Sequence, residues 1–389
     1  MTGLRKLYRR WAPLALLLQA TAAASQSPEA FPDSTLVLRG GDYLDVRTGR
    51  LRPNGAIVVR GGKIVAMHPP GRGWRPPPGA RVLDLDGRTI LPGLIDAHVH
   101  LTIAGDPDSN ASATLRAGFT TVVDLGSAGG AGVRLRNAIA AGGVSGPTVI
   151  AAGSWIGAKG GVCEFGGATV NSGDEARARA LADLEAGADL LKVCVTGWPK
   201  DAVEFPDSVE LKAEPLGAVM KVASAARRPV FAHAIGRAGA LLAASQGVRA
   251  LAHTPIVDSA GAAALKRTGV SVISTLASLG PRQGGPEVRR SFRLLHQAGV
   301  PIVLGTDAGV LPHGKNAEEL VALTEAGLSP AEALRAATID AAALLGSKEI
   351  GEIRAGAAGD LVVVAGDPLR DIHVLERPEL VVKGGRPVN

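Results

Sequence analysis

Short apolar segments that each end in a possible metal ligand most constrain what this chain can fold into. The first segment, Leu94–His100, follows a Pro-Gly turn and ends in His98-Val99-His100. Residues two apart on a β-strand point to the same side, so His98 and His100 project together, as two imidazoles that bind one metal must. Such a pair alone is a modest signal, because histidines also lie hydrogen-bonded in protein cores.

Four later apolar segments end in the same way. They carry Lys192, His233, His253 and Asp307, the last within Gly305-Thr306-Asp307-Ala308-Gly309. In a barrel of parallel strands, side chains at the carboxyl ends of the strands meet at one mouth. We therefore expect these residues to converge with the histidine pair.

Strand and helix patterns alternate between residues 93 and 347. Eight strands with helical crossovers predict a (β/α)8 TIM barrel. The expected strands are 94–100, 119–125, 148–152, 190–196, 230–234, 250–254, 271–276 and 302–307. Helical patterns lie between them, such as 174–185 and 210–226. A further helix is expected to begin at Ser329, with Pro330 in its first turn and Glu332 at N3, and to end near Gly346.

The segments on either side of the barrel have strand character. Residues 34–90 show a period of mostly two with glycine breaks, and Leu361–Val364 and Leu380–Val382 return to this pattern near the C-terminus. We expect residues 34–92 and 348–389 to join into one small β-sandwich domain beside the barrel of residues 93–347.

Residues 1–25 have the composition of a signal peptide. Basic residues between Arg5 and Arg10 precede an apolar run, Trp11–Leu18, and a small-residue stretch around Ala24. The run is shorter than the ~20 residues of a membrane span. We expect an exported protein, periplasmic or secreted, with no stable membrane insertion after cleavage; the sequence leaves the Sec and Tat routes open.

The charge balance argues against a nucleic-acid partner. The formal net charge is +6, but four basic residues lie in the first 24 residues, and the rest of the chain carries 38 basic against 36 acidic residues. A nearly balanced body lacks the electrostatic footprint of a nucleic-acid binder. The expected partner is a small-molecule or short peptide-like substrate, and whether the chain forms a homo-oligomer is left open.

From about residue 35 to the C-terminus, these motifs together resemble the amidohydrolase superfamily. The resemblance is to the branch that holds metal-dependent Xaa-Pro dipeptidases and imidazolonepropionase-related hydrolases. It implies that His98, His100 and Asp307 bind one divalent cation and that His233 and His253 bind a second. In relatives, a lysine at the position of Lys192 is N-carboxylated and bridges the two metals. Zinc suits such ligands best, and manganese or cobalt could serve the same site.

Lys192 and Asp307 have chemical roles in this interpretation. Carboxylation needs a neutral amine, which the apolar segment Leu190–Val195 favours, although a lysine can also extend from a strand end to water. Asp307 is the expected catalytic residue: it takes a proton from the attacking water and gives it to the leaving nitrogen. Its alternative role is that of a turn or capping aspartate.

Three residues are candidates for substrate binding: Trp155, Trp198 and His313. The tryptophans follow the third and fourth expected strands in a chain with only 3% aromatic residues, and His313 follows the eighth. Cys163 and Cys194 lie near the same barrel end. We expect two buried free thiols there, with a disulfide as the alternative that export would permit.

The chain departs from the dipeptidase pattern around the substrate. Val162-Cys163 follow Gly160-Gly161 where relatives often have a histidine, and the only tyrosines, Tyr8 and Tyr43, lie outside the barrel. We therefore predict hydrolysis of an amide or peptide-like C–N bond without specifying a dipeptide. A lactone or ester hydrolase is the alternative. A deaminase is less favoured because no glutamate closely follows His233. A non-catalytic binding protein is also less favoured, because every predicted ligand position is filled.

Overall fold

The computed structural model describes residues 35–71, 73–197, 209–253, 256–279 and 285–388. The described residues all belong to one compact unit, Ser34–Asn389. The predicted signal peptide, residues 1–25, and the predicted substrate residue Trp198 lie outside the described residues.

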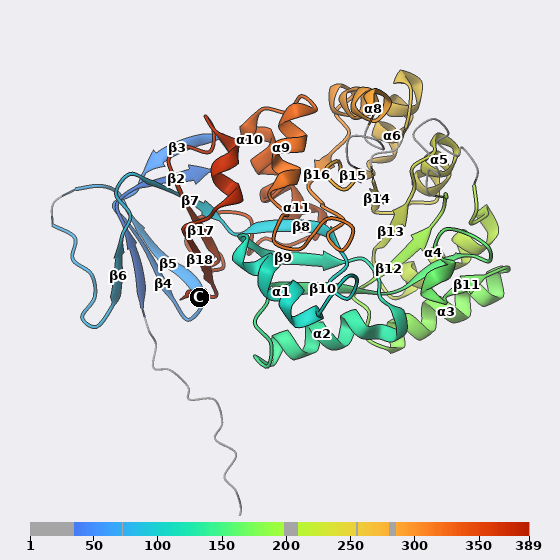
Figure 1. Ribbon diagram of the computed structural model, residues 1–389, viewed down its shortest axis with the longest axis horizontal. Coiled ribbons are helices and arrows are strands. Elements are labelled where there is room, and N and C mark those ends of the chain that lie inside the picture. Colours follow the sequence, from blue (N-terminus) through green and yellow to red (C-terminus); the bar gives the residue numbers. More distant parts are fainter. Residues whose placement is uncertain (1–34, 72, 198–208, 254–255, 280–284, 389) are drawn as a thin grey trace, which may run out of the picture. The chain divides into compact units, whose positions relative to one another are not determined.

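Eight parallel strands form the predicted barrel (Figure 1). All eight begin at the predicted residue, because each is a buried apolar run next to a turn. The predicted (β/α)8 fold is therefore confirmed. In spatial order the strands are β8 (Leu94–Val99), β9 (Phe119–Asp124), β10 (Thr148–Ala158), β12 (Leu190–Cys194), β13 (Val230–His233), β14 (Ala250–Ala252), β15 (Ser271–Ile273) and β16 (Ile302–Val303), with β11 (Thr169–Val170) paired to β10.

The barrel closes between β8 and the segment that follows β16. The amide of Ala97 donates to the Leu304 carbonyl at 3.0 Å, and the amide of Asp307 donates to the His98 carbonyl at 2.7 Å. The amide of His100 then donates to the Ala308 carbonyl, also at 2.7 Å. This pairing brings the first and last predicted ligands of the barrel sequence side by side.

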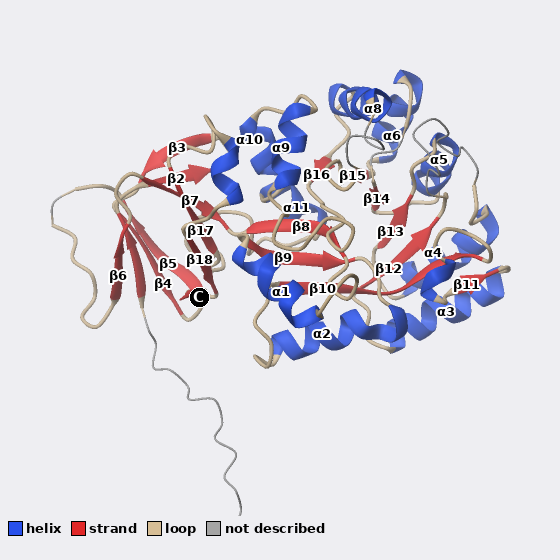
Figure 2. Cartoon of the chain, in the orientation of Figure 1, coloured by secondary structure: helices blue, strands red, loops and turns tan. Residues whose placement is uncertain are grey.

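Helices flank the barrel strands (Figure 2). None of the helices in the described part of the chain is long and apolar enough to cross a membrane. They are α1 (Pro107–Arg116), α2 (Ala131–Ala140), α3 (Gly173–Glu185), α4 (Ala213–Ala225), α5 (Arg237–Ser245), α6 (Ser259–Thr268), α8 (Pro286–Gln297), α9 (Glu318–Glu325), α10 (Pro330–Ala336) and α11 (Ile339–Leu344), with 3₁₀ turns at Ala128–Gly130, Glu164–Gly166 and Ile372–Glu376.

The prediction of one helix from Ser329 to Gly346 is wrong in one respect: the segment forms two helices, α10 and α11. The predicted capping box of Ser329 and Glu332 is present. The helix stops because the carbonyls of Ala336 and Ala337 accept hydrogen bonds from the amides of Leu304 and Ile95, in the barrel wall. Carbonyls used in this way do not serve the i+4 amides that would continue a helix.

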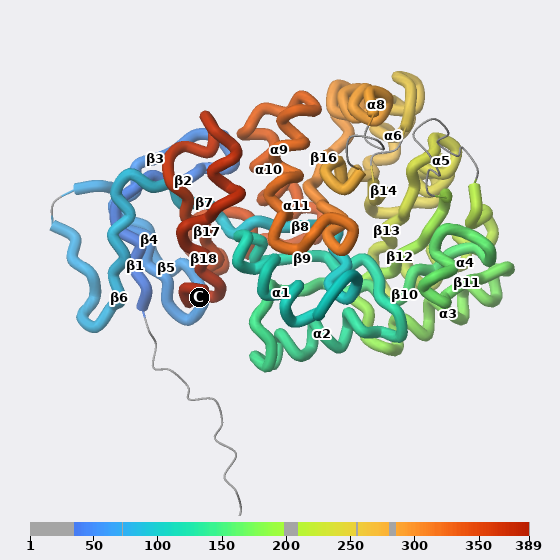
Figure 3. Tube along the Cα trace, viewed as in Figure 1, coloured from blue at the N-terminus to red at the C-terminus, as the bar shows by residue number. Residues whose placement is uncertain are grey.

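Two sheets stand beside the barrel, and the larger one mixes strands from both ends of the chain (Figure 3). Apolar residues of both sheets, among them Leu38, Ile57, Ile90 and Val363, share one buried core. The smaller sheet has the order β5 (Lys63–His68), β4 (Ala56–Arg60), β1 (Leu36–Arg39), β6 (Arg81–Asp84); the larger has β19 (Arg386–Pro387), β18 (Leu380–Lys383), β17 (Leu361–Ala365), β7 (Arg88–Pro92), β2 (Asp42–Asp45), β3 (Arg50–Pro53).

Gly93 joins the larger sheet to the barrel. β7 ends at Pro92 and β8 begins at Leu94, while the Gly93 amide donates to the Asp360 carbonyl at 2.8 Å. A Cβ at this position would collide with the Thr120 side chain, so only glycine fits. The start of β8, and with it the direction of the histidine pair, is thereby held against β17 and β9.

Candidate metal centre

One cavity at the carboxyl ends of the barrel strands collects all six predicted metal ligands. The cavity measures about 210 Å³. Its lining includes His98 and His100 from β8 and the following residue, Lys192 from β12, His233 from β13, and His253 and Asp307 from the segments after β14 and β16. All six side chains are buried. The sequence-based expectation of convergence is met, while the roles of these residues as ligands stay predictions.

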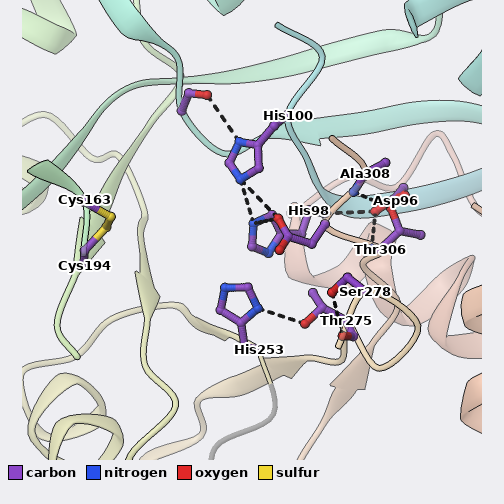
Figure 4. A network of polar contacts seen from close by, with 12 residues as sticks. Asp96, His98, His100, Cys163, Cys194, His253, Thr275, Ser278, Thr306 and Ala308 are labelled. Atoms are coloured by element: carbon purple, nitrogen blue, oxygen red, sulfur yellow. Dashed lines mark hydrogen bonds and ion pairs between the residues drawn. A yellow bond between two sulfur atoms is a disulfide. The ribbon is translucent and has the colours of Figure 1, made fainter. Parts of the chain in front are cut away.

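Three ligand atoms meet at one point. The Nε2 atoms of His98 and His100 lie 3.2 Å apart, and Asp307 Oδ1 lies 3.2 Å from the first and 3.3 Å from the second. His253 approaches from the other side, with its ring centroid 5.0 Å from that of His98 (Figure 4). Within the described residues, His98, His253 and Asp307 form a group with the spacing of a metal site.

The outer nitrogens of two of these imidazoles are held by neighbours. His100 Nδ1 lies 3.3 Å from the Gly126 carbonyl oxygen, and His253 Nδ1 lies 2.9 Å from Thr275 Oγ1 (Figure 4). A carbonyl only accepts, so Nδ1 of His100 carries the proton and Nε2 presents a lone pair to the cavity. A partner on the outer nitrogen is what fixes the tautomer of a metal-binding histidine.

Lys192 is buried at 2% exposure, and no described group accepts a hydrogen bond from its Nζ. Burial, only partly opposed by the charge of Asp307, lowers the pKa of Lys192 to about 7. In a large share of the molecules, the Lys192 side chain is therefore the neutral amine at physiological pH. This is the state that reacts with CO₂ in the predicted carboxylation.

The charges of the site favour a cation. Burial alone would raise the pKa of Asp307, but the surrounding imidazoles, led by His98, outweigh it and hold the pKa well below its ordinary value. Burial, reinforced by Lys192, lowers the pKa of His98 and brings that of His233 to about 3. His98 and His233 are thus neutral and able to donate lone pairs, and Asp307 is an anion.

Three site residues adopt the left-handed backbone region that favours glycine. Their φ angles are +73° at His253, +48° at Thr275 and +56° at Asp307. Non-glycine residues enter this region at a cost, which is tolerated where the surrounding structure fixes the geometry. Gly305, two residues before Asp307, cannot carry a side chain because a Cβ would collide with Ile273 and His98.

Asp96 holds the two closing segments together, a role that the sequence analysis missed. Its carboxylate accepts from the amides of His98 (3.1 Å) and Thr306 (3.0 Å), from Thr306 Oγ1 (2.6 Å) and from Asn316 Nδ2 (2.8 Å). Figure 4 shows it beside His98, next to Thr306. Burial raises the pKa of Asp96 to about 6 despite these bonds. The available signal was an acidic residue inside the apolar run that ends in the histidine pair.

Glu319 supports the opposite side of the site and was also missed. From α9 its carboxylate accepts from the amides of Leu276 (2.9 Å) and Ala277 (2.7 Å), next to the Thr275 that contacts His253. Burial raises the pKa of Glu319 to about 8. No sequence pattern distinguishes it from the half-buried Glu318 beside it.

Cys163 and Cys194 form a disulfide rather than the expected pair of free thiols. The bond joins β12 to the loop between β10 and β11, and both cysteines line the cavity. The expectation failed because the shape of that loop, which brings Cys163 to the barrel, cannot be read from the spacing of the two residues.

The substrate candidates have different outcomes. Trp155 lines the cavity, with its ring centroid 5.5 Å from that of His100. His313 is not among the lining residues, because its ring nitrogens contact Thr114 Oγ1 (3.0 Å) and the His100 carbonyl oxygen (3.2 Å). It contacts the end of β8, and its predicted role in substrate binding stays a prediction. Two exposed residues that line the cavity, Phe165 and Val310, were not predicted from the sequence.

Comparison with known proteins agrees with this geometry. The model of the amidohydrolase family matches residues 89–388. The chain belongs to the amidohydrolase family. The predicted superfamily is confirmed, and a solved Xaa-Pro dipeptidase with methionine bound in its active site supports the predicted branch of amidohydrolases. That structure has a TM-score of 0.83 and 28% identity over 91% of this chain and 99% of the dipeptidase.

Two curated relatives are also similar to this amidohydrolase. Ochratoxinase from Aspergillus niger is 28% identical over a region that covers 55% of this chain and 49% of that protein. Adenine deaminase 2 from Agrobacterium fabrum is 30% identical over 94% of this chain and 59% of that protein. The chain thus spans about half to three fifths of the length of these curated relatives.

Proposed function

We propose that this amidohydrolase cleaves an amide or peptide-like C–N bond with two divalent metal ions, most suitably zinc, in the barrel cavity. The observation that carries the proposal is the meeting of His98 Nε2, His100 Nε2 and Asp307 Oδ1 within 3.3 Å of one another. Three electron-rich atoms this close repel each other unless a cation or a proton lies between them.

The donor set suits two ions. His98, His100 and Asp307 would hold one, and His233 and His253 would hold the other, with ring centroids 4.6 Å apart. Lys192 comes from β12, beside β13, and its buried, unpartnered amine is suited to carboxylation and hence to bridging both ions. Imidazole and carboxylate ligands suit zinc. When bound, such ions acidify a water molecule and polarise a carbonyl group.

The chain's own residues supply the proton transfers. The oxygen of the water attacks the carbonyl carbon, and Asp307 accepts the proton that the water releases. The C–N bond then breaks, and Asp307 delivers the proton to the leaving nitrogen. Asp96 keeps Asp307 in reach by holding Thr306, and Trp155 shields one wall of the cavity from water.

A purine deaminase is the second candidate, because the chain is similar to a protein named adenine deaminase over most of its length. Hydrolysis of a lactone or ester is the third, since the same activated water attacks either carbonyl. Ammonia release from adenine identifies the deaminase, and a matched lactone and amide pair separates the other two.

Metal content and activity of two lysine variants test the proposal. Purified wild-type protein should hold about two metals per chain and hydrolyse simple amides, and Lys192→Ala should lose both properties. Lys63→Ala, at an exposed lysine on β5, is the matched control and should keep both. Full amide hydrolysis by metal-free protein, or unchanged metal content in Lys192→Ala, would contradict the proposal.

We also propose that the mature protein works outside the cytoplasm, in the periplasm or as a secreted protein. Support comes from the composition of residues 1–25 and from the disulfide between Cys163 and Cys194, a bond that persists in oxidising compartments. Fractionation of cells that express the full chain tests this: cleaved protein in the periplasm or medium is expected, and uncleaved cytoplasmic protein would contradict it.

A further inference from the structure

The cavity has an apolar wall that the metal ligands do not explain. Trp155 packs with the disulfide, and Ile103 and Val162 pack against this cluster. Trp155 also lies between the metal site and the outside: its ring centroid is 5.5 Å from that of His100 and 5.0 Å from that of Phe165. A group bound along this wall would therefore be directly next to the bond that is cleaved.

Exposed apolar side chains gather at the mouth of this wall. In the described part of the chain, the exposed large apolar residues are Val65, Phe165 and Val310, and the last two line the cavity. Phe165 is 69% exposed and Val310 is 57% exposed. Leaving large apolar side chains in water is unfavourable, and such residues grouped at a cavity mark a surface that a ligand covers.

The charged groups around the cavity all belong to the metal site. Among the described lining residues, the ionisable side chains are those of Lys192, Asp307 and the four histidines. No arginine and no second lysine lie in the described lining. A carboxylate on the group that contacts the apolar wall would therefore lose hydration without gaining a described partner.

We propose that the apolar wall is a binding site for an uncharged aromatic ring next to the scissile bond of the substrate. The ring would pack on Trp155 and be covered by Phe165 and Val310. Apolar cavities of about 150 Å³ bind benzene; this cavity measures about 210 Å³, part of which belongs to the metal site, and the exposed Phe165 and Val310 extend its apolar wall at the mouth. The proposal rests on the proposed function, because it assigns the substrate class of the same site.

Four small amides test the ring-binding site. N-benzylacetamide carries a ring on the amine side, and N-methyl-2-phenylacetamide carries one on the acyl side. N-methylacetamide lacks the ring, and N-benzylacetamide with a carboxylate in the para position of the ring adds a charge. Dissociation constants come from ligand-observed NMR on metal-loaded protein, and hydrolysis is followed separately. At least one ring-bearing neutral amide should bind tenfold or more tightly than N-methylacetamide and than the charged analogue.

Variants of the mouth provide the controls. Phe165→Ala and Val310→Ala should weaken ring binding about fivefold each, whereas Val65→Ala, at an exposed apolar residue on β5, should not. Equal binding of all four amides, or unchanged ring binding in Phe165→Ala, would overturn the proposal. Tighter binding of a ring-bearing amide without hydrolysis of any of the four amides would refute the proposed function but support the ring-binding site. Hydrolysis without tighter binding of a ring-bearing amide would support the proposed function but refute the ring-binding site.

Discussion

Cys194 lies two residues after Lys192 on β12 and is bonded to Cys163, in the loop that carries Val162 and Phe165. One covalent bond therefore links the strand of the predicted bridging lysine to the apolar wall of the cavity. The disulfide restrains the loop in the folded chain and removes freedom from the unfolded chain.

Removing the disulfide should lower stability. The two cysteines are 31 residues apart in the sequence, and closing a loop of that length stabilises by about 3–4 kcal/mol in the chain-entropy model. Cys163→Ser should lower the free energy of unfolding in urea by up to this amount, and a reducing agent should have the same effect on the wild type but none on the variant. Equal stability with and without reductant would show that the bond contributes nothing.

Carboxylation of Lys192 should depend on pH in a defined direction. Burial lowers the pKa of Lys192 to about 7, so the fraction of neutral amine rises as the pH increases through 7. Metal-free protein in ¹³C-bicarbonate should gain a carbamate NMR signal between about pH 6 and 8. Lys192→Gln should lack this signal and Lys63→Gln should keep it; a signal that survives in Lys192→Gln would place the reaction elsewhere.

Asp96→Asn should weaken metal binding without unfolding the protein. The carboxylate accepts four hydrogen bonds that hold His98 and Thr306 in place, and an amide cannot accept all four. Loss of such support behind ligands costs roughly 10–100-fold in metal affinity. Chelator competition measures this affinity, and Asp84→Asn, at an exposed surface ion pair with Arg39, is the control. Unchanged affinity would limit Asp96 to a role in folding.

The parts of the fold that follow from local patterns could be predicted from the sequence. The eight barrel strands are buried apolar runs, and the period of two sets the common direction of His98 and His100. Their convergence with Lys192 and Asp307 follows because parallel strands end at the same edge. The capping box at Ser329 is equally local, since its two bonds lie within four residues.

The rest depends on contacts between distant residues. Asp96 is supported by Thr306 and Asn316, which lie 210 and 220 residues later, and nothing near Asp96 in the sequence indicates them. The break after Ala336 follows from the amides of Ile95 and Leu304, in the barrel wall, which donate to the helix carbonyls. Phe165 reaches the cavity through the fold of a loop, in which side-chain direction has no fixed period.

Glu319→Gln should change how stability varies with pH. Burial raises the pKa of Glu319 to about 8 from an ordinary value of 4.5. Between these two pH values the folded chain keeps a proton that the unfolded chain has lost, so this group makes stability fall as pH rises, by up to about 1.4 kcal/mol per pH unit. Glutamine has the same shape without the charge and removes this decrease.

Urea unfolding of metal-free protein from pH 5 to 8.5 measures the difference. The wild type and Glu319→Gln should be closest in stability at pH 5 and diverge toward pH 8, with the variant the more stable. Glu318→Gln, at the half-buried neighbour on α9, controls for removing one negative charge and should run parallel to the wild type. Parallel curves for Glu319→Gln as well would mean that Glu319 is ionised in the folded protein, with the amides of Leu276 and Ala277 stabilising the charge.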